Sequence, residues 1–217
     1  MQVSVFDWTL IAQGAGLTIV LSLGTMLISV PLAILLGLVR AIKSNNVFLS
    51  LVKAVITVFV AVIRGTPLML QLMFVFFGLP FLGVNIPSLT ASFAALAVYS
   101  IAYLAEVVRT GIESIAQTQW DGSASLGLDF VQTMRYVILP QAVKIMVPPS
   151  VSFFIGLIKD SSLCATIGIV ELARSGRIIV ERTHESLLIF SIVAAVYFAI
   201  CYPLSRLSKK LERNLTA

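Results

Sequence analysis

The sequence predicts an all-α integral membrane protein, a single domain over residues 1–217 built as a bundle of five transmembrane helices. Of the 217 residues, 59% are hydrophobic and 12% are charged, whereas soluble domains carry about 25% charged residues. The mean hydropathy is +1.02. Several apolar runs reach the roughly 20 residues that a helix needs to cross a bilayer. The two-residue alternation that is typical of membrane barrels does not occur.

The apolar runs give the spans in order. The first extends from Trp8 to Val39 and contains Pro31. Because it is longer than one span requires, we expect it to tilt or to begin along the outer surface. Residues 1–7 carry no positive charge, so we expect a retained span and not a cleaved signal peptide. The later runs cover about 47–79, interrupted at 64–67, then about 89–108, 145–158 continued by 161–170, and about 187–204.

The distribution of Lys and Arg predicts the orientation. Residues 40–53, residues 117–140 and the C-terminal tail contain Lys or Arg, whereas the N-terminus and residues 78–90 contain none. Because basic loops stay in the cytoplasm, five spans with the N-terminus outside and the C-terminus inside fit this pattern. The positive charges follow the sides of the membrane and form no single stripe, which argues against nucleic-acid binding.

In this orientation, residues 171–185 are expected to lie on the outer side of the membrane. Their three arginines are balanced by three glutamates, and we expect this segment to form a surface that meets a soluble protein: Glu171, Arg174, Arg177, Glu181, Arg182 and Glu185.

Residues 117–140 form a polar stretch between the third and fourth spans, and we interpret it as a docking element. Its apolar residues recur at three- and four-residue steps, which is typical of a helix with one apolar face: Leu126, Phe130, Met134, Val137 and Ile138. Gly122 and Gly127 interrupt it and Leu139-Pro140 closes it, so we expect a short helix, a turn directed by glycine and a second helix. The alternative is an amphipathic loop on the lipid surface.

A helix break is predicted within the second span at Arg64-Gly-Thr-Pro67. Thr66 followed by Pro67 is typical of an N-cap with proline at the first helical position. The free N–H groups of such a half-helix suit a substrate carboxylate, and Met69 and Gln71 lie near its start. The alternative is a packing kink whose Arg64 pairs with an acid or reaches towards the surface.

The fourth span contains a similar pattern at Asp160-Ser161-Ser162. Asp160 either caps a helix that begins at Ser161 or presents its carboxylate to an ammonium or guanidinium group. We favour contact with substrate, because two broken helices at corresponding depths are the best sequence indication of a transport site.

Other polar residues in the spans have a simpler interpretation beside the functional one. Glu106 either pairs with Arg109 within its helix or lines the cavity, and Tyr103 and Tyr99 either line the same cavity or pack. His184 has no partner at ligand spacing, so no metal site is predicted. Cys164 and Cys201 suit a packing role.

The sequence contains no catalytic constellation and no nucleotide-binding loop. We therefore predict a transport protein that is not an enzyme. If it moves solute uphill, the energy comes from a partner or from an ion gradient.

Three spaced motifs resemble those of membrane subunits of bacterial ATP-binding-cassette (ABC) importers, and the resemblance covers nearly the whole chain. The first is the run Trp120-Asp121-Gly122-Ser123-Ala124-Ser125-Leu126-Gly127 followed by Ile138-Leu139-Pro140-Gln141-Ala142. The runs Arg64-Gly-Thr-Pro67-Leu68 and Lys159-Asp160-Ser161-Ser162-Leu163 are similar to signatures of the polar amino acid subfamily. Asp121 stands where the family usually has Glu, and Gly122 and Ser123 stand where it has two alanines, so a weaker helix start is expected.

The resemblance implies a permease of the type I importer fold in the bacterial cytoplasmic membrane. The coupling helix around Asp121–Gly127 would fit a groove on a cytoplasmic ATPase subunit, which uses ATP and Mg. It also implies a second permease subunit, expected to be identical, and an extracytoplasmic amino acid-binding protein that residues 171–185 would help receive. The expected substrate-binding residues are Arg64, Thr66, Met69, Gln71, Tyr103, Glu106, Asp160, Ser161, Ser162 and Leu163.

We expect the half-helix at Thr66–Pro67 to hold the substrate carboxylate and Asp160 to hold a positive group. A basic amino acid, meaning arginine, lysine or histidine, is therefore the first expectation, and glutamine or another polar amino acid is the alternative. Two further alternatives are a scaffold half of a heterodimer and an ion-coupled secondary carrier without an ATPase.

Overall fold

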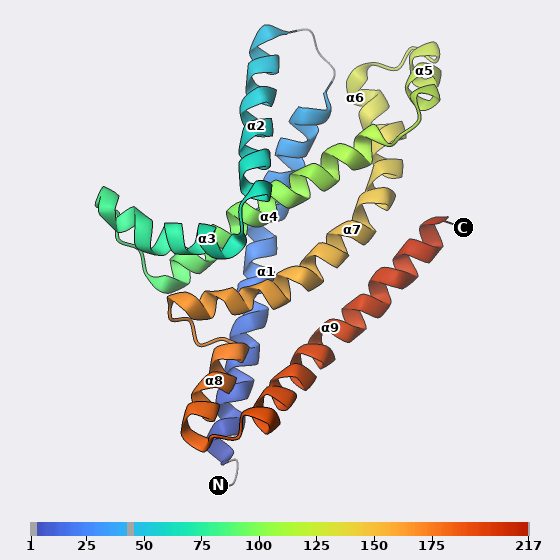
Figure 1. The fold of residues 1–217 in the computed structure, drawn as a ribbon. Coiled ribbons are helices and arrows are strands. Elements are labelled where there is room, and N and C mark those ends of the chain that lie inside the picture. The colour runs from blue at the N-terminus through green and yellow to red at the C-terminus, as the bar shows by residue number, and fades with distance from the viewer. Residues whose placement is uncertain (1–3, 43–45, 217) are drawn as a thin grey trace.

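A computed structural model describes residues 4–42 and 46–216; residues 1–3, 43–45 and 217, which include part of the predicted turn over 40–53, lie outside the described residues. The described chain consists of helices joined by short connections (Figure 1). Its elements are α1 (Val5–Ala41), α2 (Val47–Gly65), α3 (Leu68–Met73), the π-turn η1 (Phe74–Gly78), the 3₁₀-turn η2 (Leu79–Leu82), α4 (Ser88–Glu113), α5 (Gln117–Ser125), α6 (Phe130–Thr133), the π-turn η3 (Met134–Ile138), α7 (Leu139–Asp160), the 3₁₀-helix η4 (Ser161–Ile167), α8 (Leu172–Thr183) and α9 (Ser186–Thr216).

Five of the described helical segments are long and apolar enough to cross a membrane, in agreement with the five predicted spans. They are Val5–Ala41, Val47–Gly65, Ser88–Glu113, Phe130–Ile167 and Ser186–Arg213. The first is a single helix of 37 residues, about 55 Å long at 1.5 Å per residue. Since a bilayer core is about 30 Å thick, α1 extends well beyond it, as its apolar length predicted.

The packing centres on α1, which runs through the middle of the molecule and is crossed by α4 and α7 (Figure 1). The α1–α4 contact uses small residues on both helices, which let two backbones approach closely in a membrane. A Cβ added at Gly37 would lie 2.5 Å from the Cβ of Val108, and the Ser29 hydroxyl donates to the Ala97 carbonyl at 3.3 Å. Residues at three- or four-residue steps form the buried face of α1: Thr18, Ser22, Thr25, Ser29, Ala33 and Gly37.

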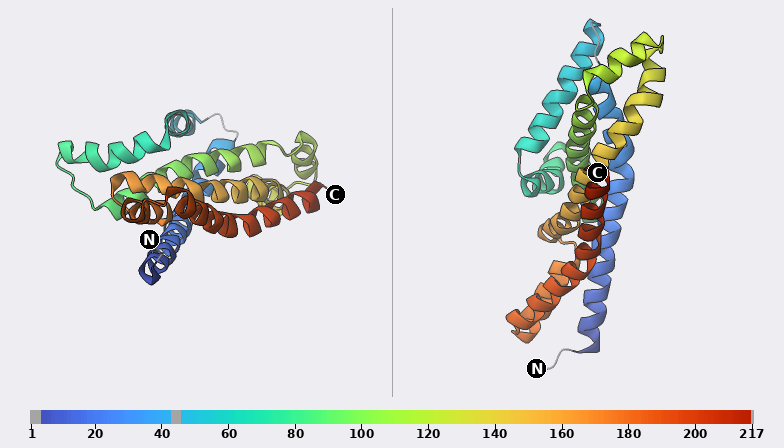
Figure 2. Two further views of the ribbon diagram at one scale, coloured as in Figure 1. Left: turned by 60° about the horizontal axis from the view of Figure 1, so that its bottom comes forward. Right: turned by 90° about the vertical axis from the view of Figure 1, so that its right-hand side faces the viewer.

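The amphipathic helix α8 packs beside the first turns of α1 and against α9, and both views of Figure 2 show it at the end of the molecule where α1 begins. The helices α5 and α6 lie at the opposite end, beyond the last turn of α4 (Figure 1). The two polar segments that the sequence predicts on opposite sides of the membrane are thus far apart in the fold.

Candidate functional site

The predicted docking element has the expected order of helix, turn and helix, with two corrections. Helix α5 ends at Ser125 and Gly127 adopts a left-handed conformation, φ 74°, before α6 begins. Gly122, however, lies inside α5 and makes no turn. Leu139-Pro140 does not end the second helix either, because α6, η3 and α7 are continuous from Phe130 to Asp160. The π-turn η3 ends just before Pro140. Proline has no N–H to donate to the preceding turn, and the altered hydrogen bonding of a π-turn accommodates this loss.

The rest of the chain buries only part of the apolar face of this element. Met134 and Ile138 are buried against Ile112 and Ile115 at the end of α4. Leu126 at the turn is 80% exposed, and the other residues of the motif from Asp121 to Gly127 are exposed except Ser123.

Trp120 anchors α5 to the rest of the docking element. Its ring stacks on that of Phe130, with centroids 6.4 Å apart. The exposed side of α5 and the turn therefore remains available to a partner.

The break in the second span lies where the sequence predicts it, but the capping is different. Thr66 ends α2 as its C-cap, and its hydroxyl donates to the Val62 carbonyl at 2.9 Å, so it does not cap the next helix. Pro67 is the N-cap of α3. A threonine hydroxyl that bonds back to the preceding turn is satisfied there and is lost as an N-cap.

Gln71 holds this break together. Its side-chain N–H₂ donates to the Ile63 carbonyl at 2.7 Å and to the Thr66 carbonyl at 3.1 Å, while its own carbonyl oxygen is buried without a hydrogen-bond partner among the described residues. Thr66 and Gln71 line a cavity of about 550 Å³ between α2, α3 and α4. Met69 is exposed on α3.

Asp160 is the last residue of α7, and the chain continues directly into η4. The alternative in which Asp160 caps a new helix at Ser161 is wrong, because Asp160 keeps a right-handed helical conformation and makes no side-chain cap. Its half-buried carboxylate makes no hydrogen bond or salt bridge with any described residue. The Ser161 hydroxyl donates to the Ile158 carbonyl at 2.8 Å, and Ser162 and Leu163 are half-buried.

The helix break at Pro67 and the change from α-helix to 3₁₀-helix after Asp160 meet in one apolar cluster. Leu68 and Leu72 of α3 pack with Leu157 of α7 and with Cys164 and Ile167 of η4. The segment that follows Pro67 and the segment that follows Asp160 are therefore neighbours in space, as the transport-site hypothesis requires.

Glu106 is the centre of an ion-pair cluster. Its carboxylate lies 2.7 Å from Arg40 of α1, 2.6 Å from Arg109 of α4 and 3.5 Å from Arg64 of α2. Both simpler interpretations, the Glu106–Arg109 pair and the pairing of Arg64 with an acid, are therefore present. Arg40 is 8% exposed and Arg64 is 41% exposed, so Arg64 is the least enclosed of the three guanidinium groups.

A row of aromatic rings leads from Arg64 towards Asp160. The Arg64 guanidinium carbon lies 5.1 Å from the Tyr103 ring centroid. The Tyr103 ring packs on Tyr99 with centroids 4.6 Å apart and stacks on Phe153 at 5.6 Å. Asp160 lies two turns after Phe153 on the same face of α7.

Sequence reasoning missed three participants in this region. Arg40 was interpreted only as a marker of topology, and nothing in its local pattern indicates a partner 66 residues away. Phe153 is one apolar residue of a long apolar run, so nothing in the sequence indicates that it stacks on Tyr103. Glu171 was predicted on the external surface, which is wrong: it is fully buried and caps α8.

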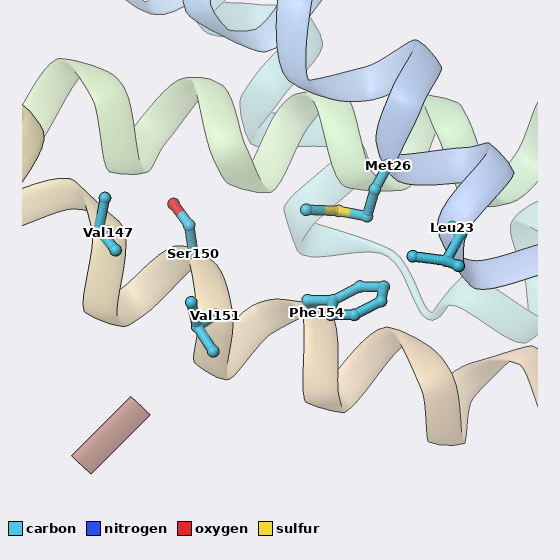
Figure 3. A pocket seen from close by; sticks show the side chains of 6 residues that line it. All are labelled: Leu23, Met26, Val147, Ser150, Val151 and Phe154. Atoms are coloured by element: carbon cyan, nitrogen blue, oxygen red, sulfur yellow. The ribbon is translucent and has the colours of Figure 1, made fainter. Parts of the chain in front are cut away.

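A separate apolar groove of about 360 Å³ lies between α1 and α7, and it includes none of the predicted substrate residues. Leu23 and Met26 of α1 face Phe154 and Ser150 of α7 across it (Figure 3). The Ser150 hydroxyl donates to the Met146 carbonyl at 2.8 Å, so the groove presents no free polar group from these side chains.

Comparison with known proteins identifies the family. Residues 29–217 match the family of binding-protein-dependent transport system inner membrane components. The chain belongs to this family. The glutamine transport system permease protein GlnP of Escherichia coli strain K12 is 36% identical over 222 residues, which cover 97% of this chain and 98% of that protein. The arginine transport system permease protein ArtQ of Bacillus subtilis strain 168 is 32% identical over 201 residues, which cover 92% of this chain and 90% of that protein.

A crystal structure of an amino acid ABC transporter with histidines contains a chain that is 34% identical. It superposes with a TM-score of 0.86 over 99% of this chain and 100% of that one. The resemblance to polar amino acid importer permeases is therefore confirmed, as is the type I importer fold. This inner membrane component is a transport subunit.

Proposed function

We propose that this permease moves a polar amino acid inward across the bacterial cytoplasmic membrane by alternating access, driven by a partner ATPase. The observation that carries the proposal is that the helix break at Pro67 and the change from α-helix to 3₁₀-helix after Asp160 meet in one apolar cluster. Binding sites in membrane transporters form where discontinuous helices meet, because free backbone groups there replace the water around a charged substrate.

The row from Arg64 to Asp160 suits a zwitterion. At one end, the exposed Arg64 guanidinium and the first N–H groups after Pro67 offer positive charge to a carboxylate. At the other end, the free Asp160 carboxylate accepts from an ammonium, guanidinium or amide donor. Tyr99 and Tyr103 supply aromatic faces between them, and such faces attract cations.

We propose a basic amino acid as the first substrate candidate, with its side chain at Asp160. An unpaired carboxylate within a membrane span is costly, and a cationic side chain relieves that cost. Ser161, Ser162 and Leu163 would complete this end, and Thr66, Met69 and Gln71 the other, while Glu106 holds Arg64 in place.

Glutamine is the second candidate, since its amide also donates to a carboxylate. The 36% identity to the glutamine permease, compared with 32% to the arginine permease, favours it.

The proposed assembly contains a second permease subunit, an ATPase that binds ATP and Mg, and an extracytoplasmic binding protein. The exposed motif from Asp121 to Gly127 would dock on the ATPase in the cytoplasm. The N-terminus and α8 would then lie outside and the C-terminus inside. Within this chain, only 6% of an 18-residue apolar stretch of α2 and 11% of the corresponding stretch of α9 are buried. Both spans therefore have faces that a second, identical copy would cover.

The test is ATP hydrolysis by the complex reconstituted in lipid vesicles with its binding protein, stimulated in turn by L-arginine, L-lysine, L-histidine and L-glutamine. Asp160→Asn is expected to abolish stimulation by the basic amino acids while the complex still assembles. Glu113→Gln is the matched control, because it makes the same carboxyl-to-amide change at an exposed residue of α4 that belongs to neither the proposed site nor α8.

The outcomes separate the candidates. Stimulation by basic amino acids that Asp160→Asn removes supports the first candidate, and stimulation by glutamine alone supports the second. Equal stimulation of wild type and Asp160→Asn contradicts the role of Asp160. Transport that persists without ATP and collapses with an ionophore contradicts the ATPase-driven mechanism itself.

A further inference from the structure

The first turn of α8 packs closely against two membrane helices. The buried Glu171 carboxylate accepts from the N–H groups of Ala173 at 2.9 Å and Arg174 at 2.8 Å, and from the Tyr197 hydroxyl of α9 at 3.0 Å. Burial raises the pKa of the Glu171 carboxyl, and the two N–H donors oppose that rise. On the α1 side, Gly14 lies so close to α8 that a Cβ there would meet the Ser175 hydroxyl at 2.3 Å.

Arg174, three residues into this turn, reaches out of α8 to the segment that follows Asp160. Its Nη1 donates to the Ala165 carbonyl at 2.9 Å. The same carbonyl accepts from the N–H of Gly168, which has φ 96° and ends η4. The Nε of Arg174 is buried and has no hydrogen-bond partner among the described residues, so one donor remains unsatisfied in this arrangement.

The segment that Arg174 holds is short and continuous with the proposed site. Helix η4 runs from Ser161 to Ile167 directly after Asp160, and Cys164 and Ile167 pack against α3. A 3₁₀-helix has weaker hydrogen-bond geometry than an α-helix, so its position depends more on contacts from outside. A displacement of Arg174 therefore acts on a segment that follows Asp160 directly and packs against the helix that begins after Pro67.

We propose that Arg174 is a positioning residue that transmits docking of the binding protein on α8 to the substrate segment at Asp160–Leu163. The exposed face of α8, which includes Arg177, Ile178 and Glu181, would receive the binding protein. Docking shifts α8, Arg174 moves the Ala165 carbonyl with it, and η4 changes the placement of Asp160. This inference rests on the proposed function, because it needs a binding protein outside and a substrate at Asp160.

The test separates transmission from docking by comparing two arginines on the same helix. Arg177 is exposed and makes no hydrogen bond or salt bridge within the described residues, so Arg177→Ala removes the same charge as Arg174→Ala without touching η4. Each complex is reconstituted with its ATPase in lipid nanodiscs. ATP hydrolysis is then measured against the concentration of binding protein loaded with L-arginine or L-glutamine, whichever stimulates the wild type.

Arg174→Ala is expected to lower the maximal stimulated rate at saturating binding protein by about fivefold or more, the lower end of typical couplings between sites. The basal rate is expected to be unchanged. Arg177→Ala is expected to raise the concentration of binding protein needed for half-maximal stimulation and to leave the maximum unchanged. An unchanged maximum in Arg174→Ala, or an equal loss in both variants, overturns the inference.

A second measurement covers the case in which Arg174→Ala assembles poorly. Hydrogen exchange of residues 161–168 is followed in wild type and Arg174→Lys with and without the loaded binding protein. We expect docking to change exchange in this segment of the wild type and to leave it unchanged in the variant. The same change in both proteins overturns the inference. A wild-type complex that shows no stimulation by any of the amino acids instead contradicts the proposed function.

Discussion

Glu106 shows how a single carboxylate organises three helices. It faces Arg40, Arg64 and Arg109, and its side chain is 19% exposed. A charged group within a membrane span is costly unless it is paired. The cluster therefore fixes the start of the helix break at Arg64 relative to α1 and α4.

Glu106→Gln should destabilise the protein strongly. The change leaves Arg40 nearly buried without a counter-charge, and loss of one partner from a buried pair costs about 2 kcal/mol or more. The measurement is the midpoint of thermal unfolding in detergent, followed by tryptophan fluorescence.

Glu113→Gln serves as the control for Glu106→Gln. Glu113 is 45% exposed and, among the described residues, pairs only with Arg109, and exposed pairs contribute about 0.5 kcal/mol. Equal shifts of the two midpoints would show that the Glu106 cluster adds nothing beyond a surface pair.

At the level of elements, the docking segment contains two glycines with opposite requirements. Gly122 is helical within α5, whereas Gly127 has φ 74°, and a Cβ at either position would meet no atom within 4 Å. Sterically the two sites are equal, so only the backbone conformation distinguishes them. The departure of this sequence from alanine at Gly122 therefore weakens α5 without serving the turn.

Gly122→Ala should stabilise α5 by about 0.5–1 kcal/mol, because glycine is a poor helix former. Gly127→Ala should destabilise the turn by about 1 kcal/mol, because a Cβ is unfavourable in a left-handed conformation. Hydrogen exchange of residues 117–128 measures both effects. We expect slower exchange in the first variant and faster exchange in the second, and a shift in the same direction for both would refute the assignment of the turn to Gly127.

For the whole molecule, the main question is which polar segment faces which side. Leu126 and Glu181 are separated by the span Phe130–Ile167, so we expect them to lie on opposite faces of the membrane. The distribution of Lys and Arg predicts that Leu126 faces the cytoplasm.

Cysteine labelling tests this orientation in a background that carries Cys164→Ala and Cys201→Ala. In right-side-out vesicles, an impermeant maleimide should label the Glu181→Cys variant. The Leu126→Cys variant should react only after the membrane is opened. Reversed labelling would overturn the orientation, and labelling of both from one side would overturn the fourth span.

The sequence predicted where the helices break but not how their ends are capped. Thr66 and Asp160 both have the residue types of N-caps, yet the Thr66 hydroxyl bonds back to Val62 and Asp160 remains within a helical turn. Residue type alone does not distinguish these cases, because the same side chain can bond to the turn before it or to the turn after it. Glu171 also has the residue type of a surface charge, and its burial depends on Tyr197 and Gly14.

By itself the sequence determined the five spans, the amphipathic segment at 117–140 and the helix break at 64–67. These follow from the length of apolar runs and from local residue patterns, and neither depends on which segments meet in space. The tertiary structure alone decided that Glu106 faces Arg40 and Arg64 and that Arg174 reaches the Ala165 carbonyl. Such contacts depend on how helices cross, and small residues at helix interfaces permit many crossings, so the final arrangement is set by the packing of the whole chain.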